Sequence, residues 1–160
     1  YLKRATPQNI VIGGIAGASP PLLGWVAVTG TIDPHALLLV AIIFAWTPPH
    51  FWALCLAKQA EYAEAGIPML PVTHGRPYTK LQMVLYSVLM VVVTLLPVLT
   101  GMCGWIYLVW VSLLNARFLW LMRVVWSSEE DADAMRLFFY SIRYIMWLFL
   151  ALLVDHFFVL

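Results

Sequence analysis

Long apolar runs, separated by short polar segments, extend along the whole chain. A helix needs about 20 mostly apolar residues to cross the hydrocarbon core of a bilayer. The runs that meet this requirement are Asn9–Thr29, Ala36–Ala57, Leu81–Leu99, Met102–Met122 and Leu137–Val159. The pattern therefore predicts an all-α fold, a polytopic membrane helical bundle with about five transmembrane helices.

The composition supports a membrane protein. Of the 160 residues, 63% are hydrophobic and 11% are charged, whereas soluble domains have about 45–50% apolar and about 25% charged residues. Such a chain cannot keep its apolar surface out of water by folding on itself, so it needs a lipid bilayer around it. The net charge of +1 and the lack of a basic run interleaved with aromatic residues argue against a nucleic-acid partner.

The polar connections predict the orientation. The short ones, Gly30–His35 and Thr100–Gly101, contain no Lys or Arg, and the charges gather in the longer ones, Lys58–Lys80 and Arg123–Arg136. With five spans, every basic residue lies at or near one side of the membrane, which the positive-inside rule makes cytoplasmic. These residues are Lys3, Arg4, Lys58, Arg76, Lys80, Arg117, Arg123, Arg136 and Arg143.

Proline pairs interrupt the first two apolar runs, in "ASPPLLGW" at Ala18–Trp25 and "WTPPHFW" at Trp46–Trp52. Each proline lacks an amide hydrogen, so the carbonyl four residues earlier loses its helical partner. In lipid such carbonyls are costly, and interrupted helices persist only where protein or a wet cavity covers them. We expect two interrupted helices that line one cavity. The alternative is a kink in each helix, with Ser19, Thr47 and neighbouring helices satisfying the carbonyls. The carbonyls concerned belong to Ala16, Gly17, Phe44 and Ala45.

Small residues recur at four-residue spacing in the first run, at Gly13, Gly14, Gly17 and Ala18. Residues four apart lie on one helix face, and small side chains there let another helix approach closely. This pattern indicates packing rather than chemistry.

An ionisable side chain, His50, lies well inside the second run. Ionisable groups inside a membrane are costly and are functional candidates that face the bundle interior. The alternative is a neutral imidazole that donates to a carbonyl freed by Pro48 or Pro49. The residues alone leave both interpretations open.

Two carboxylates, Glu61 and Glu64, follow the cytoplasmic end of the second run, beside Lys58 and Tyr62. If the helix persisted to Glu61, that residue would lie about 16 Å from His50 along the axis and be rotated by about 20°. A cytoplasmic carboxylate and a deep imidazole would then share a face. Carboxylates here can hold Mg²⁺, which binds through one or two carboxylates plus substrate phosphates; the alternative is a solvated loop.

Basic residues stand at two further places in the predicted cytoplasmic half. Lys3 and Arg4 precede Asn9 at the start of the first run, where positive side chains beside a helix N-terminus favour an anion such as diphosphate; alternatively they only set the topology. At the start of the last run, Arg136 and Arg143 share a helix face. Snorkelling to the headgroups is the preferred explanation for Arg143 and for Arg117.

Four blocks of the sequence closely resemble the haem O synthases, the protohaem IX farnesyltransferases of the UbiA prenyltransferase superfamily. In the family's order they are "YLKRATPQNIVIGGIAGASPPLLGWVAVTG", "WTPPHFWAL", "EYAEAGIPMLPVTHG" and "RLFFYSIRYIMWLFLALLVD", and the resemblance covers essentially all 160 residues. It implies nine transmembrane helices around a cavity open to the cytoplasm or matrix. Residues 1–160 would be the C-terminal part of this single UbiA-type domain, with the last five helices.

The resemblance also implies an activity. Members of the family transfer the farnesyl group of farnesyl diphosphate to a vinyl group of haem B and give haem O for terminal oxidases. Mg²⁺ holds the diphosphate through two acidic motifs. The implied partners are farnesyl diphosphate, haem B, the lipid bilayer and assembly factors of terminal oxidases, and a bacterial inner membrane is favoured over a mitochondrial one.

The resemblance assigns roles residue by residue. Glu61 stands where the family has the Asp of "DYxxAGxPMLPV", so it is the expected Mg²⁺ ligand with one extra methylene, and Lys58 and Tyr62 flank it as expected catalytic residues. The block "LKRxTPQN" places Lys3, Arg4 and Asn9 at the diphosphate. The "PPH" motif makes His50 the expected haem contact, as an axial ligand or by orienting the haem.

The first acidic motif of the family, NxxxDxxxD, occurs nowhere between Tyr1 and Leu160. We read Tyr1 as a cut end, expect the motif upstream, and expect these 160 residues alone to be inactive. From the physics alone, a secondary transporter with paired broken helices is the rival function. A haem-handling protein without catalysis is another, and prenylation of a quinone or chlorophyll is disfavoured by the "WTPPHFW" and "AGIPMLPV" wording.

Overall fold

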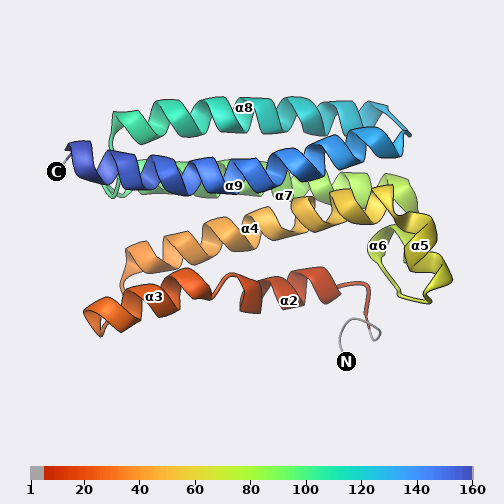
Figure 1. The fold of residues 1–160 in the computed structure, drawn as a ribbon, viewed down its shortest axis with the longest axis horizontal. Helices are drawn as coiled ribbons and strands as arrows, with labels where there is room; N and C mark the ends of the chain where they lie inside the picture. The colour runs from red at the N-terminus through yellow and green to blue at the C-terminus, as the bar shows by residue number, and fades with distance from the viewer. Residues whose placement is uncertain (1–5, 160) are drawn as a thin grey trace.

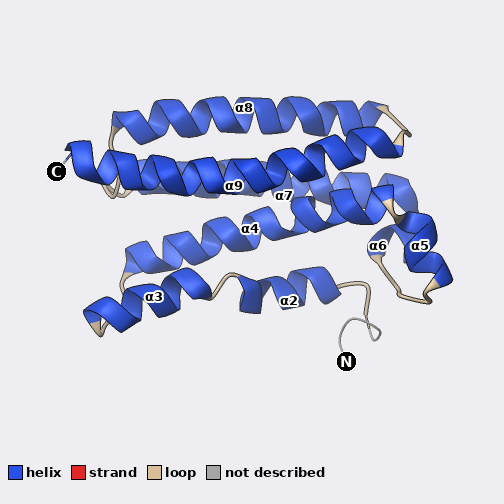
Figure 2. Ribbon diagram, in the orientation of Figure 1, coloured by secondary structure: helices blue, strands red, loops and turns tan. Residues whose placement is uncertain are grey.

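The computed structural model describes residues 6–159 of the chain. Within that range the secondary structure is entirely helical, without strands, which confirms the predicted all-α class (Figure 2). The helices in chain order are α2 (Asn9–Gly17), α3 (Pro20–Thr29), α4 (Pro34–Ala57), α5 (Gln59–Glu64), α6 (Leu70–Thr73), α7 (Gly75–Leu99), α8 (Trp105–Ser127) and α9 (Asp131–Val159).

Within residues 6–159, the helical segments long and apolar enough to cross a membrane number 5, as predicted. They are Asn9–Thr29, Pro34–Ala57, Gly75–Leu99, Trp105–Ser127 and Asp131–Phe158. The helices α4, α7 and α9 begin earlier than the apolar runs, most clearly α7 and α9, whereas α8 begins later, at Trp105. Hydropathy detects only the part of a helix that suits lipid, whereas backbone hydrogen bonding continues into the polar residues at its end. The chain is an integral membrane protein.

The four long helices α4, α7, α8 and α9 form a packed bundle (Figure 1). The helix α4 packs on both α7 and α9, and α8 packs on the same two helices from the other side. The segments α2 and α3 lie along α4 at the edge of this bundle, as Figure 1 shows. Large buried side chains of the four long helices fill its centre; they include Trp52, Met83, Met90, Tyr107, Phe118 and Tyr144.

The first proline pair interrupts its helix as predicted. The helix α2 ends at Gly17, and Pro20 begins α3, where a missing amide hydrogen removes no helical bond. The Ser19 hydroxyl donates to the carbonyl of Ala16 over 2.8 Å. One of the carbonyls expected to lose its partner is therefore satisfied locally, without a neighbouring helix.

The second proline pair does not interrupt its helix, so that prediction is wrong. Pro48 and Pro49 lie inside the continuous helix α4, and both are buried. The reason is packing, because this helix is held between α7 and α9, and protein covers the positions that lipid would penalise. The Thr47 hydroxyl donates to the carbonyl of Ile43 over 2.7 Å.

Asp155, near the end of α9, and most of the described basic residues lie at opposite ends of the bundle. Asp155 is 1% exposed and accepts the backbone N–H groups of Gly104 at 2.6 Å and Tyr107 at 2.9 Å. It thereby satisfies the start of α8 from the end of α9. The opposite end, which we call the basic end, holds α5, α6, the start of α7 and the α8–α9 connection (Figure 1). It carries Lys58, Arg76, Lys80, Arg123 and Arg136.

Candidate functional site

A pocket of about 570 Å³ lies between α2 and α4 and reaches the α5–α6 segment. Its wall is formed by α2 residues, by α4 residues and by Tyr62 and Met69. The lining residues from α2 are Asn9, Ile10, Gly13, Gly14 and Gly17, and those from α4 are Ile43, Trp46, Thr47 and Phe51. The predicted cavity between the first two spans is thus present, although the proline pairs are not part of its wall.

Glycines set the width of this pocket. A Cβ atom on Gly14 would lie 3.3 Å from Cγ2 of Thr47, so the two helices approach each other closely at that point. A Cβ atom on Gly13 or Gly17 would meet nothing within 4 Å, and both residues line the pocket. The small-residue pattern therefore has two effects, since Gly14 allows the helix contact and the other two leave space beside it.

Two of the predicted site residues, Asn9 and Tyr62, line the pocket together. Asn9 is buried at the start of α2, and the half-buried Tyr62 comes from α5. Burial raises the pKa of the Tyr62 phenol above its usual value, and the charge of Lys58 opposes this only in part. The Tyr62 hydroxyl is therefore protonated at neutral pH and can donate a hydrogen bond to an anion.

Lys58 and Glu61 form an ion pair beside Tyr62. The Lys58 Nζ lies 2.7 Å and 2.9 Å from the two carboxylate oxygens of Glu61. Glu61 is 68% exposed, and an exposed pair of this kind contributes little to stability, so both side chains can exchange partners readily.

The helix α4 does not persist to Glu61, so the condition under which Glu61 and His50 would share a helix face is not met. It ends at Ala57, because Lys58 leaves the helical conformation with φ −117° and ψ 29°, and α5 begins anew at Gln59. His50 and Glu61 therefore lie on different helices, α4 and α5.

His50 lies in the contact between α4 and α9 rather than in the wall of the pocket. Its ring is stacked between Trp46, at a centroid distance of 4.3 Å, and Phe138, at 4.7 Å. Its Nδ1 lies 2.6 Å from the hydroxyl of Ser141. In the alternative interpretation a carbonyl freed by Pro48 or Pro49 was the partner of His50; in the structure the Nδ1 contact is made by a side chain of α9 instead.

The hydrogen bonds around Ser141 indicate the tautomer of His50. The Ser141 hydroxyl donates to the carbonyl of Phe138 over 2.6 Å. Because a serine hydroxyl has a single proton, its oxygen then accepts from Nδ1–H of His50. The Nε2 atom of the neutral ring carries the lone pair, which can accept a hydrogen bond or bind a metal ion.

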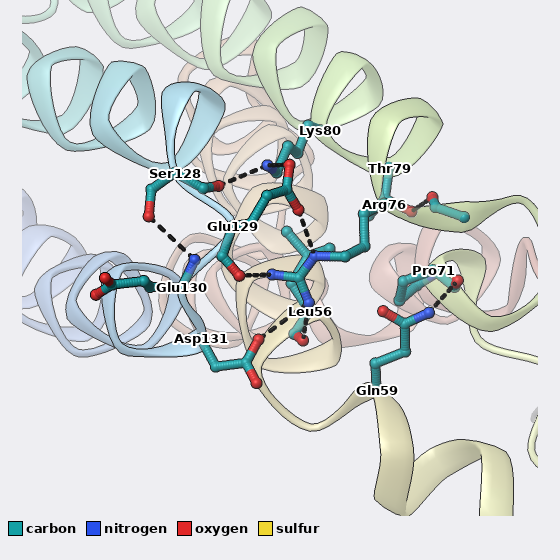
Figure 3. Close-up of polar contacts among 11 residues, drawn as sticks. Leu56, Gln59, Pro71, Arg76, Thr79, Lys80, Ser128, Glu129, Glu130 and Asp131 are labelled. Carbon is teal, nitrogen blue, oxygen red and sulfur yellow. Dashed lines mark hydrogen bonds and ion pairs between the residues drawn. The ribbon is translucent and has the colours of Figure 1, made fainter.

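A cluster of charged side chains holds the basic end together (Figure 3). The guanidinium group of Arg76 contacts Glu129 at 3.1 Å and Asp131 at 3.0 Å, and it donates to the carbonyl of Leu56 over 3.1 Å. Lys80, 4% exposed, donates to Glu129 over 2.8 Å. The start of α7, the end of α4 and the α8–α9 connection are thus tied together next to the candidate site.

The α5–α6 segment is attached to the same region. The side-chain amide of Gln59 donates to the carbonyl of Pro71 over 2.8 Å, as Figure 3 shows. Gly66 has φ 62°, a left-handed conformation that favours glycine, and the chain turns there between α5 and α6. These contacts fix the position of Tyr62 and Met69 at the end of the pocket.

Sequence reasoning missed Ser141 and the cluster around Arg76 and Lys80. The acidic run "SSEED" between two apolar stretches was an available signal for the cluster, because it lies on the same predicted side as those basic residues. Nothing in the sequence pairs Ser141 with His50. The predicted diphosphate residues Lys3 and Arg4 lie outside the residues that the structure describes.

The described side chains offer few ligands for a Mg²⁺ ion. Within residues 6–159 there is no group of three or more His, Cys, Asp or Glu side chains that could hold a metal ion. The exposed carboxylate of Glu61 can nevertheless act as one ligand of a Mg²⁺ ion that is bound largely through substrate phosphates. The residues present fit that mode of binding and do not fit a metal cage built by this part of the chain alone.

Known proteins are similar to this chain in sequence or in fold. Proteins named protoheme IX farnesyltransferase from Hahella chejuensis and from Legionella pneumophila (strain Paris) are each 60% identical, over 98% and 99% of the chain, respectively. The chain spans about half of their length, 52% and 54%. A solved structure described as digeranylgeranylglyceryl phosphate synthase has the same fold, with a TM-score of 0.84 at 19% identity, over 93% of this chain and 52% of that one.

The family itself is identified by a sequence model. The model of the UbiA prenyltransferase family matches residues 1–153, which is nearly the whole chain. The helical fold, the five membrane spans and the pocket beside the second span agree with this match. The chain therefore belongs to the UbiA prenyltransferase family.

Proposed function

We propose that the protein containing this chain transfers the farnesyl group of farnesyl diphosphate to a vinyl group of haem B, giving haem O. The observation that carries the proposal is the pocket between α2 and α4, whose mostly apolar wall ends at Asn9 and Tyr62. The Lys58–Glu61 pair lies near Tyr62, outside the lining. Such a pocket suits an apolar chain with an anionic head. The names of the relatives at 60% identity favour haem as the acceptor.

The polar end of the pocket is the proposed diphosphate site. Tyr62 donates a hydrogen bond from its hydroxyl to a phosphate oxygen, and Lys58 turns from Glu61 to the same anion. Asn9 offers its amide from α2, and Lys3 and Arg4 are proposed to complete the site. When bound, Mg²⁺ would neutralise the negative charge of the diphosphate, and Glu61 is the ligand that this chain would contribute.

The apolar wall is proposed to hold the farnesyl chain. Ile10 and Gly13 of α2 face Ile43 and Phe51 of α4 across the pocket. When the bond between the farnesyl carbon and the diphosphate oxygen ionises, the electron pair leaves with the diphosphate and an allylic cation forms. The Thr47 hydroxyl in this wall already donates to the carbonyl of Ile43, and away from the polar end the other lining side chains carry no hydroxyl or carboxylate. The wall therefore keeps water and other nucleophiles from this cation until the vinyl carbon attacks. Addition of water to the cation left on the former vinyl group, with loss of a proton, then completes the product.

His50 is the proposed haem contact. Its support is the tautomer, because Nδ1 is engaged by Ser141 and Nε2 remains as the basic atom that could ligate or orient haem. The stacked rings of Trp46 and Phe138 hold the imidazole in one orientation. An orientation fixed before binding reduces the entropy lost when a ligand binds.

Residues 1–160 also need a position within the whole protein and a membrane that holds it. We propose that residues 1–160 form the C-terminal part of a single UbiA-type domain and that the remaining part supplies the first acidic motif. The bacterial origin of the relatives supports a bacterial inner membrane. Assembly factors of terminal oxidases are proposed partners, since the product would be used there.

The transporter alternative loses its main support. It depended on a pair of interrupted helices facing each other, and within the described residues α4 is continuous through Pro48 and Pro49. A membership in the UbiA prenyltransferase family favours group transfer instead.

The test is a product assay with the full-length protein. It is incubated with haem B, farnesyl diphosphate and Mg²⁺, and the haem is then analysed by mass spectrometry. The proposal expects haem O, and no product when Mg²⁺ is chelated. Unchanged haem together with prenylation of an added quinone precursor or chlorophyll precursor would contradict the acceptor, and no prenylation of any acceptor would contradict the activity.

A further inference from the structure

A second pocket with charged walls lies between α8 and α9, away from the α2–α4 pocket. Its volume is about 400 Å³, and three arginines, Arg117, Arg136 and Arg143, line it. The only carboxylate in its lining within the described residues is Asp133, so the lining side chains carry an excess of positive charge. We call this pocket the arginine groove.

Two of the three guanidinium groups have no carboxylate partner among the described residues. Arg136 pairs with Asp133 at 3.1 Å. Arg117 lies over the ring of Tyr140, at 5.4 Å from its centroid, and Arg143 has only a long contact of 3.4 Å to the carbonyl of Phe139. Both are exposed on the surface of the bundle. An anion can therefore approach them without displacing an existing ion pair.

The depth of these two residues in the helices is unusual for arginine. Arg117 lies ten residues before the end of α8 at Ser127, and Arg143 lies twelve residues after the start of α9 at Asp131. At 1.5 Å per residue, these separations correspond to about 15 Å and about 18 Å along the helices. Charged groups so far from the basic end are costly in hydrocarbon unless they reach a headgroup or are paired.

The groove is also fixed in shape. The Tyr140 hydroxyl donates to the carbonyl of Leu114 over 2.9 Å, so the ring that Arg117 covers is anchored between the two helices. The exposed rings of Trp120 and Phe139 stand beside the guanidinium groups in the same lining. The groove thus combines cations that can bind phosphate with apolar surface that suits an acyl chain.

We propose that the arginine groove binds the phosphate headgroup of an anionic glycerophospholipid from the leaflet at the basic end. Arg117 and Arg143 hold the phosphate, and the acyl chains lie along Trp120 and Phe139. Basic pockets between transmembrane helices on the cytoplasmic side are sites of this kind. A lipid explains both the charge and the aromatic lining, whereas free phosphate would explain only the charge.

The neighbouring α7–α8 face provides a matched control. A pocket of about 290 Å³ there has Arg123 as the one charged lining residue among those the structure describes, together with apolar side chains such as Val84 and Trp126. Arg123 lies on the same helix as Arg117, nearer the basic end. A single arginine at headgroup depth sets topology but forms no convergent anion site.

The experiment measures lipid binding by the full-length protein. Three proteins are compared: the wild type, the double variant Arg117→Gln/Arg143→Gln and the control Arg123→Gln. Each is titrated with phosphatidylglycerol and with phosphatidylcholine, and bound lipids are counted by native mass spectrometry. We expect the wild type and Arg123→Gln to retain phosphatidylglycerol preferentially. The double variant should bind it about tenfold more weakly or worse, because charge-assisted hydrogen bonds to the phosphate are lost.

Thermal unfolding in each lipid separates this result from misfolding. In phosphatidylcholine the double variant should unfold at the same temperature as the wild type, and only the wild type and Arg123→Gln should gain stability from phosphatidylglycerol. Inorganic phosphate should give no such gain. The proposal is overturned if the double variant retains phosphatidylglycerol or if Arg123→Gln loses it equally. It is also overturned if inorganic phosphate alone stabilises the protein. A wild type without lipid preference, because another part of the protein covers the groove, would overturn it as well.

Discussion

The imidazole of His50 and the hydroxyl of Ser141 lie 2.6 Å apart, although 91 residues separate them in the chain. Through this contact α9 sets the orientation and the tautomer of a side chain on α4. Both residues are buried, so no water competes for the bond. The pair connects the packing of the bundle with the residue that is proposed to contact haem.

Replacing Ser141 with Ala should destabilise the protein. The variant leaves Nδ1–H of His50 buried without an acceptor, at a cost of about 1–3 kcal/mol. The measurement is the free energy of unfolding in one fixed detergent. Ser112→Ala is the control, because the exposed Ser112 hydroxyl makes only a local bond to the carbonyl of Leu108. If the two substitutions lower the free energy of unfolding equally, the His50–Ser141 bond adds no stability beyond that of a local hydroxyl bond.

His50→Ala should weaken haem binding and alter the Soret band of the full-length protein. The proposed haem contact is lost, whereas Ser141→Ala keeps the ring and should change the spectrum much less. Absorption spectra and a haem titration of both variants provide the measurement. An unchanged spectrum and affinity in His50→Ala would remove His50 from the haem site.

Glu61→Gln should weaken Mg²⁺ binding and thereby lower the activity of the full-length protein. Losing a proposed ligand should raise the Mg²⁺ concentration needed for half-maximal activity by about 10- to 100-fold, a range typical even for groups that only support ligands. Glu64→Gln is the matched control on the same helix α5. The measurement is the activity of full-length variants as a function of Mg²⁺ concentration, and equal Mg²⁺ curves for Glu61→Gln and the wild type would refute the assignment.

The cluster around Glu129 should make stability depend on pH. The hydrogen bond from Lys80, followed by its charge, lowers the pKa of the Glu129 carboxyl below its ordinary value of 4.5. A lowered pKa means that the stabilisation is fully present above 4.5 and is lost as the pH falls through the folded-state pKa. Glu129→Gln should therefore flatten the dependence of the unfolding temperature on pH in that acidic window.

Glu130→Gln serves as the control for this pH dependence. Glu130 neighbours Glu129, is exposed, and has no ion pair within the described residues. The Glu130→Gln variant should lose stability in acid to the same extent as the wild type. If both variants lose the acidic transition equally, the Lys80–Glu129 contact is not its cause.

Two glycines of α2 should respond differently to enlargement. A side chain on Gly14 meets Thr47 at 3.3 Å, so Gly14→Val should cost about 1–3 kcal/mol of stability by overpacking. Gly13→Val has space and should leave the free energy of unfolding nearly unchanged, apart from a smaller helix-propensity effect. It should instead narrow the pocket and raise the KM for farnesyl diphosphate. Equal KM values for wild type and Gly13→Val would show that the prenyl chain lies elsewhere.

The membrane spans were predictable because they depend on local composition. About 20 apolar residues have few alternatives to a transmembrane helix, and each of the five runs corresponds to an observed span. The break before Pro20 was also predictable, since α3 lies at the edge of the bundle and none of its residues is buried, so local backbone chemistry decides there. The same reasoning was wrong for Pro48, because burial between α7 and α9 is a tertiary property that the local sequence does not contain.

The candidate site was predictable only in part. The residue types near Lys58 and Tyr62 indicated an anion site, and the pocket beside them follows from glycines spaced along α2. The end of α4 at Ala57 was not predictable, because the residues that follow are good helix formers and the Arg76 bond to the Leu56 carbonyl comes from another helix. The partner of His50 likewise required the packed structure.

Photo-cross-linking tests most directly whether the α2–α4 pocket holds the prenyl chain. The full-length protein is labelled with a photoreactive analogue of farnesyl diphosphate, with excess unlabelled substrate as competitor, and the modified peptides are mapped by mass spectrometry. The account predicts competed labelling on residues 9–17 of α2 and 43–51 of α4. Labelling confined to α7, α8 or α9, with these two segments unmodified, would contradict it.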